Sequence, residues 1–112
     1  MTENTNSKPY DLEERTFLFT KEVLNFIKVL PKSIGNIELS KQVVRSSGSI
    51  GANYIEANES LGKKDFLMRI RICRKEAKET RYWLKLLEER GKLINEVTEL
   101  MKIFGAILEK SK

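Results

Sequence analysis

The sequence predicts an all-α protein with the fold of an antiparallel up-down-up-down four-helix bundle. Four stretches of apolar residues recur with the period of an amphipathic helix, and no segment sustains the alternation of a strand. Short connections between the stretches favour antiparallel neighbours. At 112 residues, of which 40% are hydrophobic and 33% charged, the chain suits one domain. We expect this domain to span residues 11–112 and residues 1–10 to form a flexible N-terminal tail.

The first two predicted helices are defined by one apolar face each. The first runs from about Asp11 to Leu30, and Pro31 ends it. Its apolar positions are Leu12, Phe19, Val23, Phe26, Ile27 and Leu30. The second begins near Asn36, which we assign as its N-cap, and keeps its phase as far as Ala57.

The third predicted helix runs from Lys63 to about Glu89, with Gly62 at the N-cap and Asp65 as a weak capping-box analogue. Its apolar positions alternate in steps of four and three, as expected of a face that packs into a bundle core. We call this set the core seam: Phe66, Ile70, Cys73, Ala77, Thr80, Leu84 and Leu87.

The fourth predicted helix follows a break from Gly91 to Ile94, and we assign Asn95 as its N-cap. One apolar face follows the break and predicts that this helix completes the core. Its members are Val97, Leu100, Met101, Phe104 and Leu108.

The second helix contains a run of small residues within the segment VVRSSGSIGANYIEAN. Ser47 with Gly51, and Gly48 with Ala52, are small residues four positions apart, which clears space for the backbone of another helix. An alternative is that residues 48–51 form the GxxG loop of a KH-type RNA-binding module, or a phosphate-binding turn.

The surroundings of this segment favour close helix packing. A KH module needs a sheet, and a P-loop needs Gly-Lys-Ser/Thr after a strand. The same helix carries the polar residues Arg45, Asn53 and Glu56, whose roles the sequence leaves open. They are either solvated or satisfy one another at an end of the bundle.

The net charge of +5 is concentrated on the third helix, because residues 63–90 hold ten Lys or Arg against five acids, whereas the rest of the chain holds eleven of each. Seven of these cations share one broad sector at about 100° per residue. They are Lys64, Arg71, Arg74, Lys75, Lys78, Arg81 and Lys85. Like charges four residues apart repel one another, and a polyanion would relieve this repulsion. The alternative is a solvated basic face.

The third helix also has a second apolar sector, next to the basic one. Its members are Met68, Ile72, Trp83 and Leu86. Since a helix in a monomeric bundle needs only one apolar face, this sector predicts an oligomer interface. The alternative is that Trp83 packs at the rim of its own core.

Several residue types that enzymes commonly use are missing. The chain has no histidine, which removes the usual general base and the commonest metal ligand. Cys73 lies on the core seam and is interpreted as a small buried hydrophobe rather than a nucleophile. We therefore expect no catalytic site, no metal and no cofactor. With no signal peptide and no apolar run of membrane-spanning length, we expect a cytoplasmic protein without membrane contact.

Two segments closely resemble a known family. RSSGSIGANYIEANES, from Arg45 to Ser60, and KKDFLMRIRICRKEAKETRYWL, from Lys63 to Leu84, are similar to the bacterial four-helix-bundle proteins encoded in intervening sequences of large-subunit ribosomal RNA genes. The likeness covers about residues 14–87, and the fourth helix is less diagnostic. It implies that the small-residue segment lies within a helix, that the protein forms a ring-like homopentamer, and that it is a non-catalytic scaffold.

A more distant relative of that family is the accessory protein of diversity-generating retroelements. That relationship implies nucleic-acid binding through the basic surface and a reverse transcriptase, or another protein, as a partner. Two functions therefore stay open. One is an oligomeric scaffold that binds the backbone of RNA or DNA through the third helix, and the other is a protein–protein assembly module with no nucleic-acid role.

Overall fold

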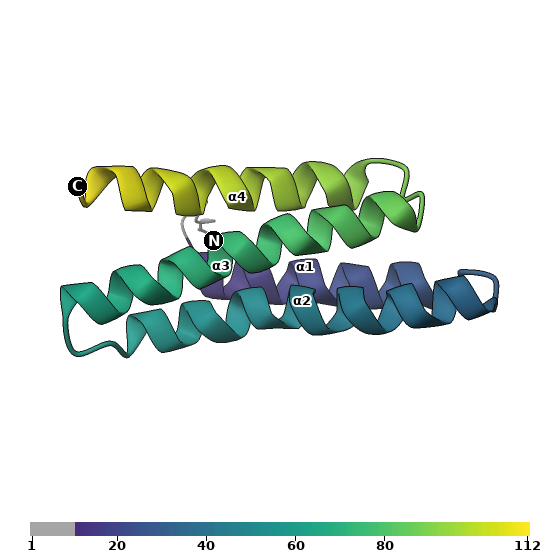
Figure 1. Cartoon of the computed structure of the whole chain (residues 1–112), viewed down its shortest axis with the longest axis horizontal. Coiled ribbons are helices and arrows are strands. Elements are labelled where there is room, and N and C mark those ends of the chain that lie inside the picture. The colour runs from purple at the N-terminus through teal and green to yellow at the C-terminus, as the bar shows by residue number, and fades with distance from the viewer. Residues whose placement is uncertain (1–10) are drawn as a thin grey trace, which may run out of the picture.

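The computed structural model describes residues 11–112, which form four α-helices and no strand (Figure 1). The helices are α1 (Leu12–Lys28), α2 (Ile34–Asn58), α3 (Lys63–Leu86) and α4 (Lys92–Lys110). The predicted all-α fold with four packed helices is confirmed. The expected N-terminal tail, residues 1–10, lies outside the described residues.

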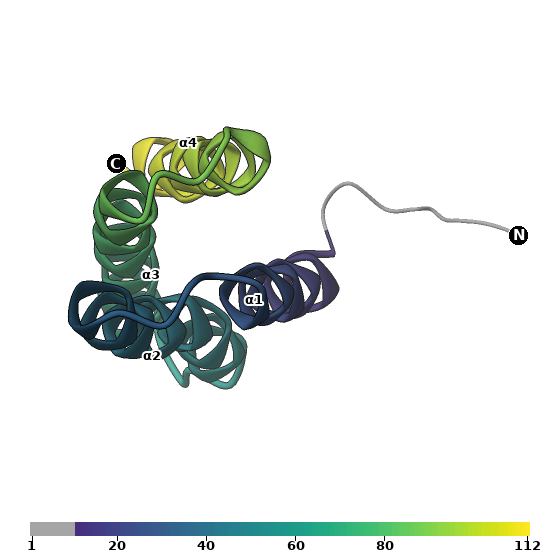
Figure 2. The same cartoon turned by 90° about the vertical axis from the view of Figure 1, so that its right-hand side faces the viewer.

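The four helices form a curved row. Figure 1 shows that the chain reverses direction at each connection, and Figure 2 shows α1 beside α2, then α3, then α4 at the far end of the row. Of the helix pairs in contact, α1 and α4 pack least extensively. Two ion pairs bridge them, Arg15 to Glu96 with Nε and Oε2 2.7 Å apart, and Lys92 to Glu22 with Nζ and Oε1 3.3 Å apart. The bundle is therefore least closed on its α1–α4 side.

The core follows the seam predicted on α3. Ile70, Cys73, Ala77, Thr80 and Leu84 are completely buried, and Leu87 and Phe66 close the two ends of the seam. The other three helices contribute further side chains with no exposed surface: Val23, Val43, Ile50, Val97, Leu100 and Phe104. The 3.6-residue period therefore identified the buried face of the central helix correctly.

The start of α2 differs from the prediction. Ser33, not Asn36, is the N-cap, and its hydroxyl accepts a hydrogen bond from the Asn36 backbone N at 3.1 Å. Asn36 lies at the third helical position, where its side-chain amide donates to the Pro31 carbonyl at 2.9 Å. Both residue types make good caps, and the extended backbone of Ser33 decides between them.

Both ends of α3 also differ in part from the prediction. Gly62 is the N-cap, as predicted, but no side-chain hydrogen bond caps this end, so the capping-box analogue with Asp65 does not form. At the other end α3 stops at Leu86 rather than at Glu89. The reason is a left-handed residue, Glu88, whose φ of 61° is incompatible with a continuing helix.

Helix α4 begins at Lys92, and its N-cap lies four residues before the predicted one. Asn95 is not the N-cap; that position belongs to Gly91, whose φ is 114°. The carboxylate of Glu89 accepts hydrogen bonds from the backbone N of Gly91 at 2.9 Å, of Leu93 at 2.9 Å and of Ile94 at 3.0 Å. A carboxylate is favoured at this end of a helix, where backbone N–H groups lack partners. Glu89 therefore supplies the cap that the prediction assigned to Asn95.

The small-residue segment lies within α2, as predicted, so it is not a KH-type or phosphate-binding loop. A Cβ added to Gly51 would lie 3.0 Å from the Thr16 Oγ1 of α1. Ser47 is buried, and its carbonyl accepts a hydrogen bond from the Thr20 hydroxyl at 3.0 Å. A Cβ on Gly48 would meet nothing within 4 Å, and Ala52 is exposed. Thus α1 approaches α2 closely at Ser47 and Gly51 and leaves the other two positions open.

Replacing Glu89 with Ala should lower the free energy of unfolding by roughly 1–2 kcal/mol, because three backbone N–H groups lose their acceptor. Urea denaturation followed by circular dichroism measures this change. Glu56→Ala is the control, since Glu56 is an exposed helical acid without such a role. Equal stabilities of the two variants would contradict the capping role.

The two central glycines of α2 should respond oppositely to substitution. Gly48→Ala should raise the free energy of unfolding by up to about 1 kcal/mol, since the added methyl group meets open space and alanine favours helix. Gly51→Leu should lower it by roughly 1–3 kcal/mol, because the side chain collides with Thr16. Thermal melts of both variants compare them directly, and an unchanged melting temperature for Gly51→Leu would contradict close packing there.

Candidate functional site

A basic groove lies between α3 and α4. Five of the seven predicted cations, Arg71, Arg74, Lys75, Lys78 and Arg81, line it from α3. Helix α4 contributes the other lining residues, Thr98, Met101, Lys102 and Gly105. The groove has a volume of about 650 Å³ and no acidic residue in its lining. Lys64 and Lys85 lie outside the groove, near the start and the end of α3, and both are exposed.

The cations of this groove are not neutralised by neighbours. Within residues 11–112 none of the seven predicted basic residues forms an ion pair, and Lys102 has only an exposed partner, Glu99, at 3.8 Å. By contrast Arg15, Arg45 and Lys92 each pair with an acid on another helix. The positive field of the groove therefore extends into solvent.

Two arginines of the groove lie against α4. The side chain of Arg74 covers Gly105, where an added Cβ would be 3.8 Å from Nη1 and 4.0 Å from Cδ. Arg81 donates a hydrogen bond through Nη1 to the Thr98 Oγ1 at 3.4 Å. Arg74 is exposed, as are Arg71, Lys75 and Lys78, whereas Arg81 is half-buried. Two of the six cations that line the groove, Arg74 and Arg81, therefore lie against α4.

The α4 half of the groove was not predicted. The sequence predicted for the fourth helix only an apolar face, and no role for Thr98, Lys102 or Gly105. A signal was present, because Arg74 and Arg81 are seven residues apart and so are Thr98 and Gly105. In an antiparallel pair these positions meet in reverse order, two turns apart.

The second apolar sector of α3 is exposed only in part. Met68 is 44% exposed and Leu86 48%, whereas Ile72 and Trp83 are half-buried. Trp83 packs against the core, and its indole Nε1 is buried without a hydrogen-bond partner among the described residues. The structure therefore places Trp83 at the rim of its own core and leaves Met68 and Leu86 as the open part of the sector.

A second exposed apolar area, missed in the sequence reading, lies on α1 and α2. Phe17 is 61% exposed, Leu18 50% and Ile55 49%. Phe17 and Ile55 flank a pocket of about 290 Å³ whose lining includes Gly48, Gly51 and Ala52. The acids beside this area are Asp11, Glu13 and Glu14. We call it the acidic apolar face. Its signal in the sequence was that Phe17 and Leu18 fall off the apolar face of the first helix.

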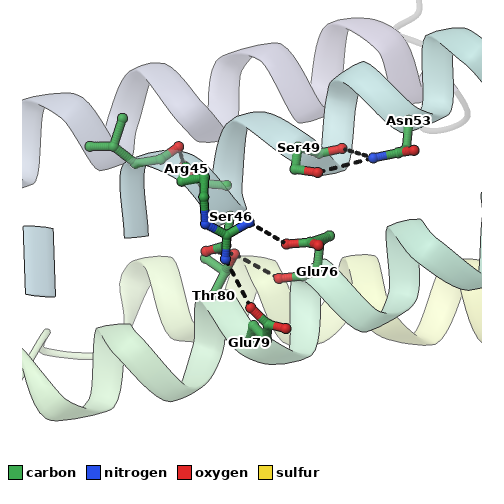
Figure 3. A network of polar contacts seen from close by, with 9 residues as sticks. Arg45, Ser46, Ser49, Asn53, Glu76, Glu79 and Thr80 are labelled. Atoms are coloured by element: carbon green, nitrogen blue, oxygen red, sulfur yellow. Dashed lines mark hydrogen bonds and ion pairs between the residues drawn. The ribbon is translucent and has the colours of Figure 1, made fainter. Parts of the chain in front are cut away.

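Arg45 has a structural role between α2 and α3 (Figure 3). Its guanidinium lies 3.6 Å from the Glu76 Oε1 and 3.1 Å from the Glu79 Oε1. The Glu76 side chain is only 12% exposed, and this oxygen has the ion pair but no hydrogen bond. Arg45 therefore compensates a nearly buried carboxylate at the helix contact.

Asn53 also serves the α2–α3 contact. Its side-chain nitrogen donates to the Ser49 carbonyl at 2.9 Å and to the Ser49 hydroxyl at 3.0 Å, as Figure 3 shows. Its oxygen accepts a hydrogen bond from Arg69 at 3.0 Å. Glu56 is exposed on the surface of α2. Arg45 and Asn53 therefore have structural partners.

Cys73 is confirmed as a buried hydrophobe. The residue is fully buried, and burial raises the pKa of its thiol to about 12, so the thiol stays protonated near neutral pH. Its sulfur donates to the Ile50 carbonyl at 3.5 Å. Within the described residues no group of His, Cys, Asp or Glu is arranged to hold a metal ion, and no helix is long and apolar enough to cross a membrane.

Comparison with known proteins identifies the family. Residues 9–109 match the model of the 23S rRNA-intervening sequence protein family. The chain belongs to this family. The match covers α4 as far as Glu109, a helix that the sequence resemblance had left less certain. A search of curated proteins finds no match.

A solved structure has a similar fold. It is a protein of unknown function from the S23 ribosomal protein family of Bacteroides thetaiotaomicron VPI-5482, 32% identical to this chain. The alignment covers 87% of this chain and 97% of that protein, with a TM-score of 0.76. The likeness to this solved structure therefore extends over most of the four-helix fold.

Proposed function

We propose that this chain is a non-catalytic, oligomeric scaffold of the cytoplasm that binds the phosphate backbone of RNA or DNA in the α3–α4 groove. The observation that carries the proposal is a groove lined by six cations and no acid: Arg71, Arg74, Lys75, Lys78, Arg81 and Lys102. Lys and Arg that neutralise phosphates release counterions, and this release drives backbone binding. A basic stripe of this kind is the usual electrostatic footprint of a nucleic-acid-binding domain.

Binding should be weakly sequence-specific. The lining offers no Asn or Gln to read adenine and no Asp or Glu to read cytosine, so base recognition would be limited to contacts of its Arg and Lys with guanine. Beyond the groove, Lys64 and Lys85 extend the positive surface along α3. Together with Arg71 and Lys78 they recur every seven residues, or about 10.5 Å along the helix, a spacing that a phosphate backbone could follow.

Assembly of several copies is the second part of the proposal, and the family resemblance favours a pentamer. Two exposed apolar areas support it, one at Met68 and Leu86 on α3 and the other on the acidic apolar face. The area on α3 borders the basic sector at Lys75, whereas the area on α1 and α2 lies beside Asp11, Glu13 and Glu14. Unlike, complementary surfaces suit a head-to-tail contact, which closes into a ring when the rotation permits.

The alternative function is a protein–protein assembly module that uses the same apolar areas and binds no nucleic acid. It would leave the basic groove solvated, which is the common fate of a charged helix face. The two functions are distinguished by measuring nucleic-acid binding on variants of the groove and oligomer size on variants of the apolar areas.

Replacing Arg71, Lys75 and Lys78 together with Ala should weaken binding to a fluorescent single-stranded or duplex DNA by tenfold or more, a rough estimate from the loss of phosphate contacts. The slope of log affinity against log salt on duplex DNA should flatten by about 0.9 per lost contact. Fluorescence anisotropy over a potassium chloride series measures both quantities.

The matched control is the triple replacement of Lys28, Lys32 and Lys110 with Ala, which removes the same charge from exposed sites outside the groove. It should bind nearly as the wild type does. Equal losses in both triple variants would show that only net charge matters. No binding by the wild type to either DNA or to RNA at low salt would favour the assembly module.

Replacing Met68 and Leu86 with Asp should reduce the oligomer size measured by light scattering, because charges would enter the proposed subunit contact. Phe17→Asp with Ile55→Asp should act in the same way on the opposite side of a head-to-tail contact. Lys41→Asp, at an exposed site of α2, is the control. A wild-type protein that is monomeric at high concentration would rule out this part of the proposal.

A further inference from the structure

Helix α4 contacts the two arginines that line the edge of the basic groove. Arg74 lies over Gly105, and Arg81 donates to Thr98, two turns away on both helices. We propose that α4 positions these two arginines for phosphate binding, with Gly105 providing the space for Arg74 and Thr98 providing the acceptor for Arg81. This inference rests on the proposed function and assigns a role to α4 residues that carry no charge.

The space above Gly105 is occupied by Arg74 rather than by another helix. Outside its own helix and among residues 11–112, the atoms within 4 Å of an added Cβ are Nη1 and Cδ of Arg74, both at ordinary contact distance. Alanine would therefore fit, although a longer side chain would occupy the volume that Arg74 now fills. Because glycine inside a helix is less stable than alanine, α4 carries a weak helix former at the position that Arg74 crosses.

Thr98 is oriented by its own helix. Its hydroxyl proton is donated to the Ile94 carbonyl at 2.7 Å, so the oxygen turns its free lone pairs away from that bond. A group that can only accept suits the Arg81 guanidinium, which can only donate. At 3.4 Å the Arg81 contact is long, and we assign it a steering role rather than a rigid clamp.

Holding both arginines before the ligand arrives reduces the conformational freedom that binding must remove. The guanidinium is planar and binds phosphate through two parallel N–H groups, so its orientation matters more than that of a lysine ammonium. Arg74 and Arg81 would therefore bind phosphates at two points about 10.5 Å apart along α3. Arg71, Lys75 and Lys78 would follow the backbone between and beside these points.

The test compares Gly105→Leu with Gly105→Ala. Gly105→Leu should displace Arg74 and weaken binding to fluorescent single-stranded and duplex DNA by roughly tenfold, as loss of a charge-assisted contact would. Its salt slope on duplex DNA should flatten by about 0.9. Gly105→Ala should bind as the wild type does and melt at a higher temperature.

A double variant separates positioning from a general loss of structure. Arg74→Ala with Gly105→Leu should bind no more weakly than Arg74→Ala alone, because both changes remove the same contact. In the protein without DNA, ¹⁵N relaxation should show the Arg74 Nε more ordered than the Arg71 Nε, and Gly105→Leu should remove this difference. On the other arm, Thr98→Val should mobilise the Arg81 Nε, and Thr98→Ser should preserve its order.

The inference is overturned if Gly105→Leu binds with the affinity and salt slope of the wild type. The inference is also overturned if the losses of DNA affinity caused by Gly105→Leu and Arg74→Ala are fully additive in the double variant. The same holds if the Arg74 side chain is as mobile as that of Arg71 in the wild type. These results leave the proposed function intact when the wild type binds DNA. A wild type that binds no nucleic acid overturns both proposals.

Discussion

The close packing of α2 against α3 is the contact on which the other features depend. Helix α1 packs mainly on α2, α4 packs mainly on α3, and α1 and α4 contact each other least. The facing residues of the central pair are small, among them Ser46, Cys73, Ala77 and Thr80, and all four are buried. Small side chains let the two backbones approach, and the Ser46 and Thr80 hydroxyls share a hydrogen bond of 2.7 Å. The α2–α3 pair thereby joins the two halves of the molecule.

This contact also determines which charges of α3 remain unpaired. Glu76 and Glu79 are the acids in the middle of α3, and both pair with Arg45 of α2. They therefore lie on the α2 side of the helix and do not neutralise the cations on the α4 side. Glu76 has to be compensated there because it is nearly buried, and an unpaired carboxylate in that place would be costly. The ion pairs of the central contact thus account for the absence of acids from the basic groove.

The sequence was sufficient for features that depend on one helix at a time. Periodicity identified the core seam of α3 and the sector that holds all seven predicted cations, because both follow from the angle per residue. It was insufficient where neighbours decide. Ser33 and Asn36 are both competent caps, and Glu89 caps α4 after the chain turns at the left-handed Glu88. The α4 half of the groove was not predicted for the same reason, because the periodicity of one helix does not show which residues of a neighbouring helix lie close to it.

The proposed assembly and nucleic-acid binding would use different sectors of α3. The residues that line the groove lie toward α4, while Met68 and Leu86 occupy the adjoining sector on the other side of Lys75. A subunit contact centred on these two apolar residues would leave Arg74 and Arg81 open to a phosphate backbone. If the acidic apolar face of a neighbouring subunit lay instead over the cations of α3, it would compete with nucleic acid for them. Apolar contacts are insensitive to moderate salt, whereas phosphate contacts are weakened by it. In the first arrangement salt would therefore weaken nucleic-acid binding and leave the oligomer intact. In the second, oligomer formation and nucleic-acid binding would depend on each other.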